Sequence, residues 1–142
     1  MALYNHYQHS LDAKGRVNFP AKLRENLGNR FIITRGLDSD RCLFAYSEEN
    51  WEALGEKIKT LPNADARRVQ RFLFAHAIDV EPDKQGRIVI PQNLREYAGL
   101  EKEVMISGIG DHAEIWDKDL WDKVNSAYTP DIIADIIDKI SL

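Results

Sequence analysis

Apolar residues occur along the chain in short runs bounded by Gly, Pro, Asp or Asn, a pattern typical of short β-strands. In residues 77–81 apolar and polar side chains alternate, as they do in a strand with one buried face. Residues 5–11 are expected to form the corresponding strand near the N-terminus. Further strands are predicted at residues 17–19, 31–34, 43–46, 88–90, 104–107 and 114–116.

Short helices are expected to follow two of these strands. Pro20 and Pro91 stand where the helices would begin, because proline is accepted in the first turn of a helix. Each helix is expected to end near a glycine, Gly28 in the first and Gly99 in the second, since glycine commonly terminates helices. Strands and short helices therefore alternate in two places along the chain.

Further helices are predicted between the two places and at the end of the chain. The dipeptide at 62–63 separates two connecting helices, the second of which is expected over residues 64–76. Side chains that accept a hydrogen bond from the first turn favour helix starts. The predicted N-caps are Ser47, Asn63 and Asp117.

The last predicted helix, which begins at Thr129-Pro130, is strongly amphipathic. Isoleucines form one stripe, and aspartates lie on the opposite side. A face so rich in isoleucine must pack on something, and two interpretations are open: the protein's own core or a neighbouring subunit. The isoleucines are Ile132, Ile133, Ile136, Ile137 and Ile140, and the aspartates are Asp131, Asp135 and Asp138.

The sequence contains an internal repeat. Residues 11–25 and 82–96 match at a constant offset of 71 positions, and they share Asp-x-x-Gly-Arg, a later proline and Leu-Arg-Glu. Two copies are too few for a solenoid, so a duplicated small domain is the simpler interpretation. We expect one pseudo-symmetric unit made of a first repeat (5–48), connecting helices (49–76), a second repeat (77–120) and C-terminal helices (121–142).

Each copy of Asp-x-x-Gly predicts a tight turn. Asp12 and Asp83 suit its first position, because an aspartate there accepts hydrogen bonds from the backbone two residues on, and the glycine suits its last. The arginine that follows, Arg16 or Arg87, is not required by the turn. It is either half of a structural ion pair with the aspartate four residues earlier or a binding residue.

The composition indicates one ordered domain: 142 residues, of which 44% are hydrophobic and 30% charged. No apolar run approaches the roughly 20 residues of a membrane helix, and the N-terminus lacks the pattern of a signal peptide. The single cysteine, Cys42, excludes an intrachain disulfide framework and fits a reducing compartment. We expect a cytoplasmic protein with no membrane partner.

The net charge of −4 argues against binding by bulk charge, but the charges are unevenly distributed. Residues 1–36 hold six Lys or Arg against two Asp or Glu (net +4), whereas residues 111–142 hold three against eight (net −5). Basic turns suit contact with phosphates, and arginine can also read guanine edges. A second basic cluster on a connecting helix is interpreted as a solvated face; it comprises Arg67, Arg68 and Arg71.

Enzymatic interpretations find little support in the motifs. There is no phosphate loop, nucleophile elbow or dinucleotide fingerprint. His6 and His9 are expected on opposite faces of a strand, which makes them a poor metal pair. Asp12 and Asp83 each have an arginine nearby, which favours ion pairing over acid–base work. We expect no enzyme, no cofactor, no metal and no small-molecule substrate.

The repeated Asp-x-x-Gly-Arg-(apolar)-x-(apolar)-Pro motif, each time followed by Leu-Arg-Glu, resembles the MraZ family of bacterial transcriptional regulators. The resemblance covers about residues 1–140. It implies an α+β, mainly β fold: a double-split, swapped-hairpin β-barrel of AbrB-like type with peripheral helices. In such a fold the two repeats combine within one chain as two chains do in an AbrB dimer.

The resemblance also implies a site and partners. The family forms ring-shaped homo-oligomers that bind direct repeats in double-stranded DNA before the cell-division and cell-wall gene cluster, and it often represses that cluster and its own gene. A nucleoid-associated regulator is therefore expected. The expected DNA contacts are Arg16, Arg87, Lys14, Lys84, Lys22 and Arg24, and the expected turn supports are Asp12, Gly15, Asp83 and Gly86.

Two other classes of function stay open on the sequence. The first is an antitoxin-like or scaffold protein whose main partner is another protein, which a toxin gene next door would favour. The second is an enzyme that uses Asp12 and Asp83, which a metal-dependent turnover assay would reveal.

Overall fold

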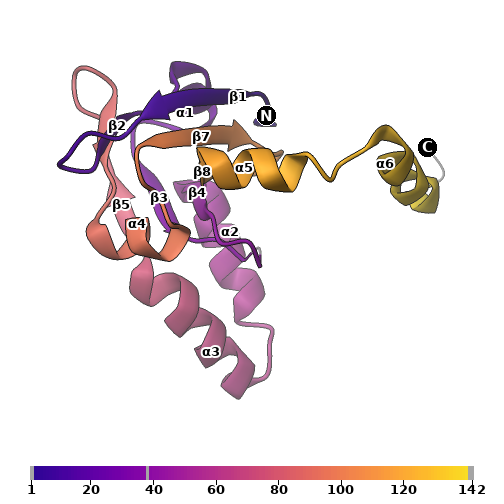
Figure 1. Ribbon diagram of the computed structural model, residues 1–142. Helices are drawn as coiled ribbons and strands as arrows, with labels where there is room; N and C mark the ends of the chain where they lie inside the picture. Colours follow the sequence, from indigo (N-terminus) through magenta and orange to yellow (C-terminus); the bar gives the residue numbers. More distant parts are fainter. Residues whose placement is uncertain (1, 38, 141–142) are drawn as a thin grey trace.

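The structure is a computed structural model that describes residues 2–37 and 39–140. Two similar units follow each other along the chain, with helices between and after them (Figure 1). The first unit contains β1 (His6–Ser10), β2 (Arg16–Asn18), α1 (Ala21–Leu27), β3 (Phe31–Arg35) and β4 (Leu43–Ser47). The second contains β5 (Ile78–Val80), β6 (Arg87–Val89), α4 (Gln92–Ala98), β7 (Glu103–Gly108) and β8 (Ala113–Asp117).

The units are joined by two helices and a 3-10 helix, and two more helices end the described chain. The connection consists of α2 (Glu48–Ile58), α3 (Asn63–Leu73) and the 3-10 helix Phe74–His76. The end consists of α5 (Lys118–Asn125), α6 (Pro130–Ile137) and the 3-10 helix Asp138–Ile140. No helix among residues 2–37 and 39–140 is both long and apolar enough to span a membrane.

The two units exchange strands. The main sheet is antiparallel, has six strands and runs in the order β1-β7-β8-β4-β3-β5. β1 of the first unit pairs with β7 of the second, and β5 of the second pairs with β3 of the first. β2 and β6 pair with each other in a separate two-stranded ribbon. The result is a mixed α+β fold with antiparallel sheets, as predicted at that level.

The main core lies where the ribbon and the two short helices pack on the sheet. Val17 and Ile88 project from the ribbon into this core, and Leu23 of α1 and Leu94 of α4 join them. All four are at most 3% exposed. Each such side chain contributes roughly 1.5–3 kcal/mol by leaving water, so the two repeats stabilise each other through one shared core.

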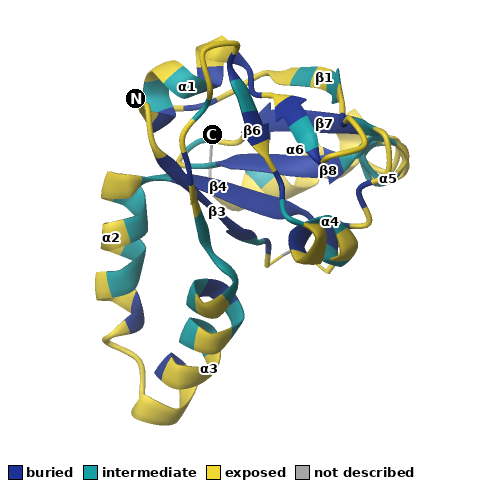
Figure 2. Ribbon diagram, turned by 90° about the vertical axis from the view of Figure 1, so that its left-hand side faces the viewer, coloured by how far each residue is buried: buried dark blue, intermediate teal, exposed yellow. Residues whose placement is uncertain are grey.

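Helices also cover the other face of the sheet. Phe44, Tyr46 and Trp116 are buried there against apolar side chains of α2 and α5. A third apolar cluster joins α2 to α3, which together extend away from the sheet (Figure 2). Because both faces are covered, the four central strands are buried at four consecutive positions, without the alternation expected of a half-exposed strand.

Most predicted helix ends are confirmed. α1 and α4 follow Pro20 and Pro91 and end before Gly28 and Gly99. Ser47 caps α2 by accepting a hydrogen bond from the backbone of Asn50. The side chain of Thr129 likewise accepts from the backbone of Ile132 at the start of α6.

Two predicted caps are wrong. α3 starts at Asn63 itself, and Pro62 occupies the cap position, where its carbonyl accepts from the backbone N–H of Ala66. Asp117 does precede α5, but its side chain accepts from the backbone of Glu101 and makes no cap hydrogen bond. Asn63 cannot cap because it is itself the first residue of the helix, and the side chain of Asp117 accepts from a distant part of the chain in place of the first turn of α5.

The interpretation that the last helix packs on the protein's own core is wrong. Ile132, Ile136 and Ile140 are 49%, 52% and 71% exposed. None of the isoleucines of α6 belongs to the apolar clusters of the described residues. In Figure 1 α6 stands apart from the sheet, linked to α5 by an extended segment.

Candidate nucleic-acid interface

The first turn is held by Asp12 through its backbone and its side chain. The backbone N–H of Gly15 donates to the carbonyl of Asp12 (3.0 Å), and Asp12 N–H donates to the carbonyl of Arg16 (2.9 Å). Asp12 Oδ1 accepts from the backbone N–H groups of Lys14 and Arg16, both at 2.9 Å. The positive φ of Gly15 (80°) is the left-handed conformation that closes such hairpin loops.

The same aspartate fixes the arginine side chain. Arg16 Nε donates to Asp12 Oδ2 over 2.6 Å. The pair uses Nε, so the two terminal amino groups of the guanidinium are not needed to hold the side chain in place. The aspartate therefore both closes the turn and orients the arginine.

The second turn repeats this arrangement. Asp83 Oδ1 accepts from the backbone of Gln85 and Arg87, and Arg87 Nε donates to Asp83 Oδ2 over 3.1 Å. Gly86 has the same φ of 80° as its counterpart in the first turn. Two sequence-related turns thus have nearly identical geometry.

Both aspartates are held in the charged form. The backbone N–H of Arg16, with its guanidinium, lowers the pKa of Asp12 to about 2. The backbone N–H of Arg87 is likewise the main cause that lowers the pKa of Asp83. A carboxyl group with a lowered pKa is a poor general acid near neutral pH, so an acid–base role for this pair is not supported.

The two turns lie side by side and bond to each other. The backbone N–H of Phe19 donates to the carbonyl of Gly86, and Ile90 N–H donates to the carbonyl of Gly15, both over 2.9 Å. Each turn is therefore anchored by the strand that leaves the other turn. Neither repeat could form this arrangement alone.

The ribbon brings both arginines to one face. Arg16 lies opposite Val89 and Asn18 opposite Arg87, while Val17 lies opposite Ile88. Directly opposite residues of an antiparallel pair point to the same side. Because Val17 and Ile88 face the core, the other four side chains form the outer face, which we call the ribbon face (Arg16, Asn18, Arg87 and Val89).

Asn18 and Val89 are functional candidates that the sequence interpretation missed. Both are exposed, and Val89 is 54% exposed although it is apolar. They stand directly across the ribbon from the two arginines. Only the register of the ribbon reveals this, because in the sequence each lies two residues from its own arginine and matches nothing in the motif.

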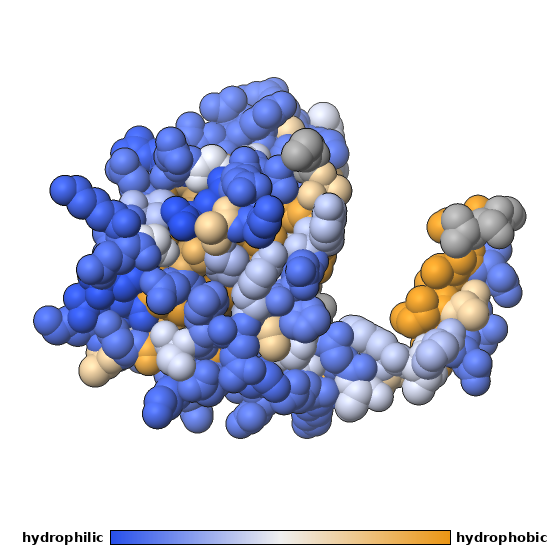
Figure 3. Space-filling model, turned by 90° about the horizontal axis from the view of Figure 1, so that it is seen from above, coloured by the Kyte–Doolittle hydropathy of each residue, from blue (hydrophilic) through white to orange (hydrophobic). Residues whose placement is uncertain are grey.

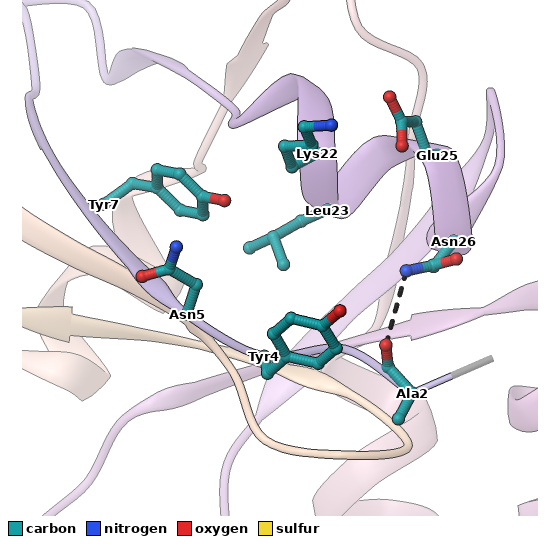
Figure 4. Close-up of a pocket in the computed structure, with 8 residues that line it drawn as sticks. All are labelled: Ala2, Tyr4, Asn5, Tyr7, Lys22, Leu23, Glu25 and Asn26. Atoms are coloured by element: carbon teal, nitrogen blue, oxygen red, sulfur yellow. Dashed lines mark hydrogen bonds between the residues drawn. The ribbon is translucent and has the colours of Figure 1, made fainter.

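The other predicted contact residues occupy different places. Lys14 and Lys84 are exposed on the turns. Lys22 lies on α1, where it lines a hollow together with Tyr4 and Tyr7 (Figure 4).

Arg24 braces a turn. It is half-buried, its Nε donates to the carbonyl of Phe19, and its guanidinium lies against Gly86 of the other repeat. Its counterpart Arg95 does the same for Gly15, with Nε donating to the carbonyl of Ile90 over 2.9 Å. The sequence interpretation included Arg24 among the DNA contacts and did not single out Arg95. Both arginines support the turns from behind.

His112 forms a second, half-buried polar cluster. Its ring lies against Phe44 and Tyr46, its Nδ1 is 2.7 Å from Asp111 and its Nε2 is 3.7 Å from Glu114. Burial opposes protonation of the ring, but the two carboxylates raise the pKa of His112 overall. No group of three metal-ligating side chains occurs among the residues that the structure describes.

The fold and the turns together define a class: a duplicated α+β protein whose repeats exchange strands and present two aspartate-held arginines on one ribbon. Comparison with known proteins identifies the family. The family model described as "MraZ protein, putative antitoxin-like" matches residues 2–72 and again 73–130. The chain therefore belongs to the MraZ family, and the predicted resemblance is confirmed.

Several curated relatives are similar over most of the chain, and each is named "Transcriptional regulator MraZ". The protein of Acetivibrio thermocellus is 59% identical over 84% of this chain and 83% of its own length. That of Pelotomaculum thermopropionicum is 52% identical over 96% and 95%, and that of a Thermoanaerobacter species 46% over 99% of both chains. These names refer to regulation of transcription, in agreement with the expectation that the chain is not an enzyme.

Proposed function

We propose that this protein is a sequence-specific DNA-binding regulator of transcription that inserts its ribbon face into the major groove. The observation that carries the proposal is the placement of Arg16 and Arg87 on one outer face of a two-stranded ribbon. The major groove accepts a two-stranded ribbon, and arginine there donates two hydrogen bonds to guanine. The relatives' name supports regulation of transcription.

Each residue of the ribbon face has a chemical role in this proposal. Arg16 and Arg87 contact base edges or phosphates, and Asp12 and Asp83 fix their direction. Asn18 suits adenine, with which an amide forms two hydrogen bonds, and Val89 suits the methyl group of thymine. Lys14 and Lys84 add phosphate contacts at the turns, with Lys22 further along the first repeat.

The wider fold is proposed to be the double-split, swapped-hairpin β-barrel of AbrB-like proteins. The exchange of β1 and β5 between the units supports it, as does the pairing of β2 with β6. The chain is then one pseudo-symmetric body made of repeats 5–48 and 77–120, with peripheral helices at 49–76 and 121–142.

We further propose that the protein acts as a ring-shaped homo-oligomer on direct repeats in promoter DNA. Its targets are the cell-division and cell-wall gene cluster and its own gene, which it represses at the nucleoid in the cytoplasm. One subunit makes few contacts, so it binds weakly. Linked subunits gain orders of magnitude in avidity without new contacts, which reconciles selective DNA binding with a net charge of −4.

The test compares alanine variants on DNA from upstream of the protein's own gene. Arg16→Ala is expected to weaken binding roughly 5- to 150-fold, since one good base contact contributes about 1–3 kcal/mol, with assembly intact by sedimentation. Arg68→Ala is the matched control, because Arg68 is exposed on α3 and away from the ribbon. Asn18→Ala is expected to reduce selectivity against scrambled DNA.

Two outcomes would contradict the proposal. Equal losses for Arg16→Ala and Arg68→Ala would mean that the ribbon face is not the contact surface. Weak, unselective binding by the unaltered protein would favour the protein-partner alternative, for which the antitoxin-like description of the family is the specific support.

A further inference from the structure

The two strands of the ribbon are related by a pseudo-two-fold axis. The repeats match at a constant offset of 71 positions, and the strands pair antiparallel with Val17 opposite Ile88 at the centre. Rotation about an axis through this central pair therefore exchanges the two repeats. Residues 12–19 and 83–90 are also buried or exposed alike at every position. On the ribbon face the axis exchanges Arg16 with Arg87 and Asn18 with Val89.

A DNA reader with exact two-fold symmetry cannot follow a site that has a direction. Two-fold symmetry in a protein is matched by palindromic sites, on which the two orientations of the protein are equivalent. The proposed targets are direct repeats, and a direct repeat has a direction. A subunit that binds such repeats in a defined orientation must therefore present two different ends of its ribbon.

The charged side chains do not distinguish these two ends. Each end carries one arginine whose Nε donates to an aspartate. Each turn also carries one exposed lysine, Lys14 in the first and Lys84 in the second. Both turns project from the same side of the molecule, at the left of Figure 1, and this side is mostly hydrophilic in Figure 3. Attraction to the phosphates is consequently similar in the two orientations.

The ends differ in the uncharged residue that accompanies each arginine. Asn18 stands across the ribbon from Arg87, and Val89 stands across it from Arg16. Both are exposed. An amide forms two hydrogen bonds with adenine, whereas an aliphatic side chain contacts the methyl group of thymine. One orientation on a given site therefore satisfies both side chains, and the reverse orientation satisfies neither.

We propose that Asn18 and Val89 together set the direction in which a subunit lies on its DNA site. This rests on the proposed function and deepens it, because it assigns to two uncharged residues a choice that the charged residues leave open. The correct orientation is expected to be favoured roughly 5- to 150-fold, the effect of one good base contact. Subunits on a row of direct repeats then all point the same way.

The test exchanges the two residues and observes the orientation directly. Asn18→Val and Val89→Asn are combined in one variant, which keeps the net charge and alters only exposed positions. An iron chelate that cleaves DNA is attached to every protein through Ala13→Cys in the first turn, while the natural Cys42 is buried. The DNA holds one site that the wild type selects from random duplexes. The wild type is expected to cleave at one end of this site and the exchanged variant at the other.

A matched control moves a charge between the turns and leaves the ribbon face unaltered. Lys14→Gln and Gln85→Lys are combined, which also keeps the net charge and alters only exposed positions. The readout is the end of the site that is cleaved. This end is expected to be the same as in the wild type, because phosphate contacts carry no sequence information.

A reciprocal test changes the DNA and keeps the ribbon of the wild type. The base pair that faces Asn18 is the one whose substitution weakens binding by the wild type but not by Asn18→Ala, and Val89→Ala identifies the other in the same way. When these two base pairs are exchanged, the wild type is expected to cleave at the opposite end.

Three results would overturn the proposal while selective DNA binding stands. They are cleavage by the exchanged variant at the same end as the wild type, equal cleavage at both ends by the wild type, and reversal in the charge control. Unselective binding by the wild type would instead contradict the proposed function, and the assigned direction with it. The two failures are therefore distinguishable.

Discussion

Replacing the glycine of each turn by alanine tests how the two turns are built into one another. Gly15 and Gly86 occupy the same position in the Asp-x-x-Gly-Arg motif and have the same φ of 80°. Their surroundings differ. A Cβ on either glycine would lie 3.0 Å from an arginine guanidinium, that of Arg95 at Gly15 and that of Arg24 at Gly86. At Gly15 it would also lie 2.7 Å from the backbone carbonyl oxygen of Ile90.

The expected losses of unfolding free energy follow from these contacts. Alanine in the left-handed conformation costs roughly 1–2 kcal/mol, and this applies to both turns. The Arg24 side chain can move aside, so Gly86→Ala should cost little more than that. In Gly15→Ala the backbone must shift and lose the hydrogen bond from Ile90 N–H to Gly15, which adds about 1 kcal/mol. We expect about 2–3 kcal/mol for Gly15→Ala.

The assay is urea unfolding at one fixed protein concentration, since the stability of an oligomer depends on concentration. Gly99→Ala is the matched control, because Gly99 has a positive φ of 63° and no atom near the added Cβ. It measures the backbone strain alone. If Gly86→Ala lost as much stability as Gly15→Ala, or more, the described packing between the turns would be refuted.

Two further predictions concern pH and use the same unfolding assay. In the folded protein the pKa of Asp12 is lowered from 3.8 to about 2. The ionised carboxylate therefore contributes to the free energy of unfolding above pH 3.8, and this contribution is lost as the pH falls toward 2. The stability gap between wild type and Asp12→Asn should therefore narrow over that range, and a constant gap would contradict the turn geometry. The pKa of His112 is raised in the folded protein from its ordinary value of 6.5. The charged ring therefore contributes fully to the free energy of unfolding below pH 6.5, and this contribution is lost as the pH rises through the folded pKa. His112→Gln should therefore differ most from wild type near pH 6, and a difference that grew toward pH 9 would refute the ion pairs with Glu114 and Asp111.

The repeated turns could be predicted from the sequence because their chemistry is local. Asp12 and Gly15 meet the requirements of a turn by themselves, and the structure places their hydrogen bonds as expected. The strands were also predictable. The predicted ribbon strands, 17–19 and 88–90, are displaced by one residue from the observed strands, which are Arg16–Asn18 and Arg87–Val89. The backbone N–H groups of Phe19 and Ile90 bond to the opposite turns, so pairing within the ribbon ends before them.

What could not be predicted depends on contacts between distant residues. No pattern in the sequence of β1 indicates that this strand pairs with β7 of the second unit and not with a strand of its own unit. The ribbon face of Arg16 and Arg87 with Asn18 and Val89 follows from a register that only the structure supplies. The role of Arg24 as a brace was missed for the same reason, since it rests on Gly86, 62 positions away in the sequence.

The helix α6 illustrates a further limit. Its isoleucine stripe and its start are visible in the sequence and confirmed in the structure. The surface that covers the stripe cannot be identified from the sequence, because amphipathicity indicates a buried face without indicating its partner. Apolar helix faces generally pack on the core of their own protein, but α6 stands apart from the sheet at the end of an extended link.

The central claim is that the ribbon face binds a specific DNA sequence. The most direct measurement is fluorescence anisotropy of the full-length protein with DNA from upstream of its own gene, compared with scrambled DNA over a series of salt concentrations. We predict tight binding to the upstream DNA only, with a steep salt dependence whose slope counts the phosphates contacted, about 0.9 per phosphate. Equally weak binding to both DNAs at every salt concentration would contradict the account.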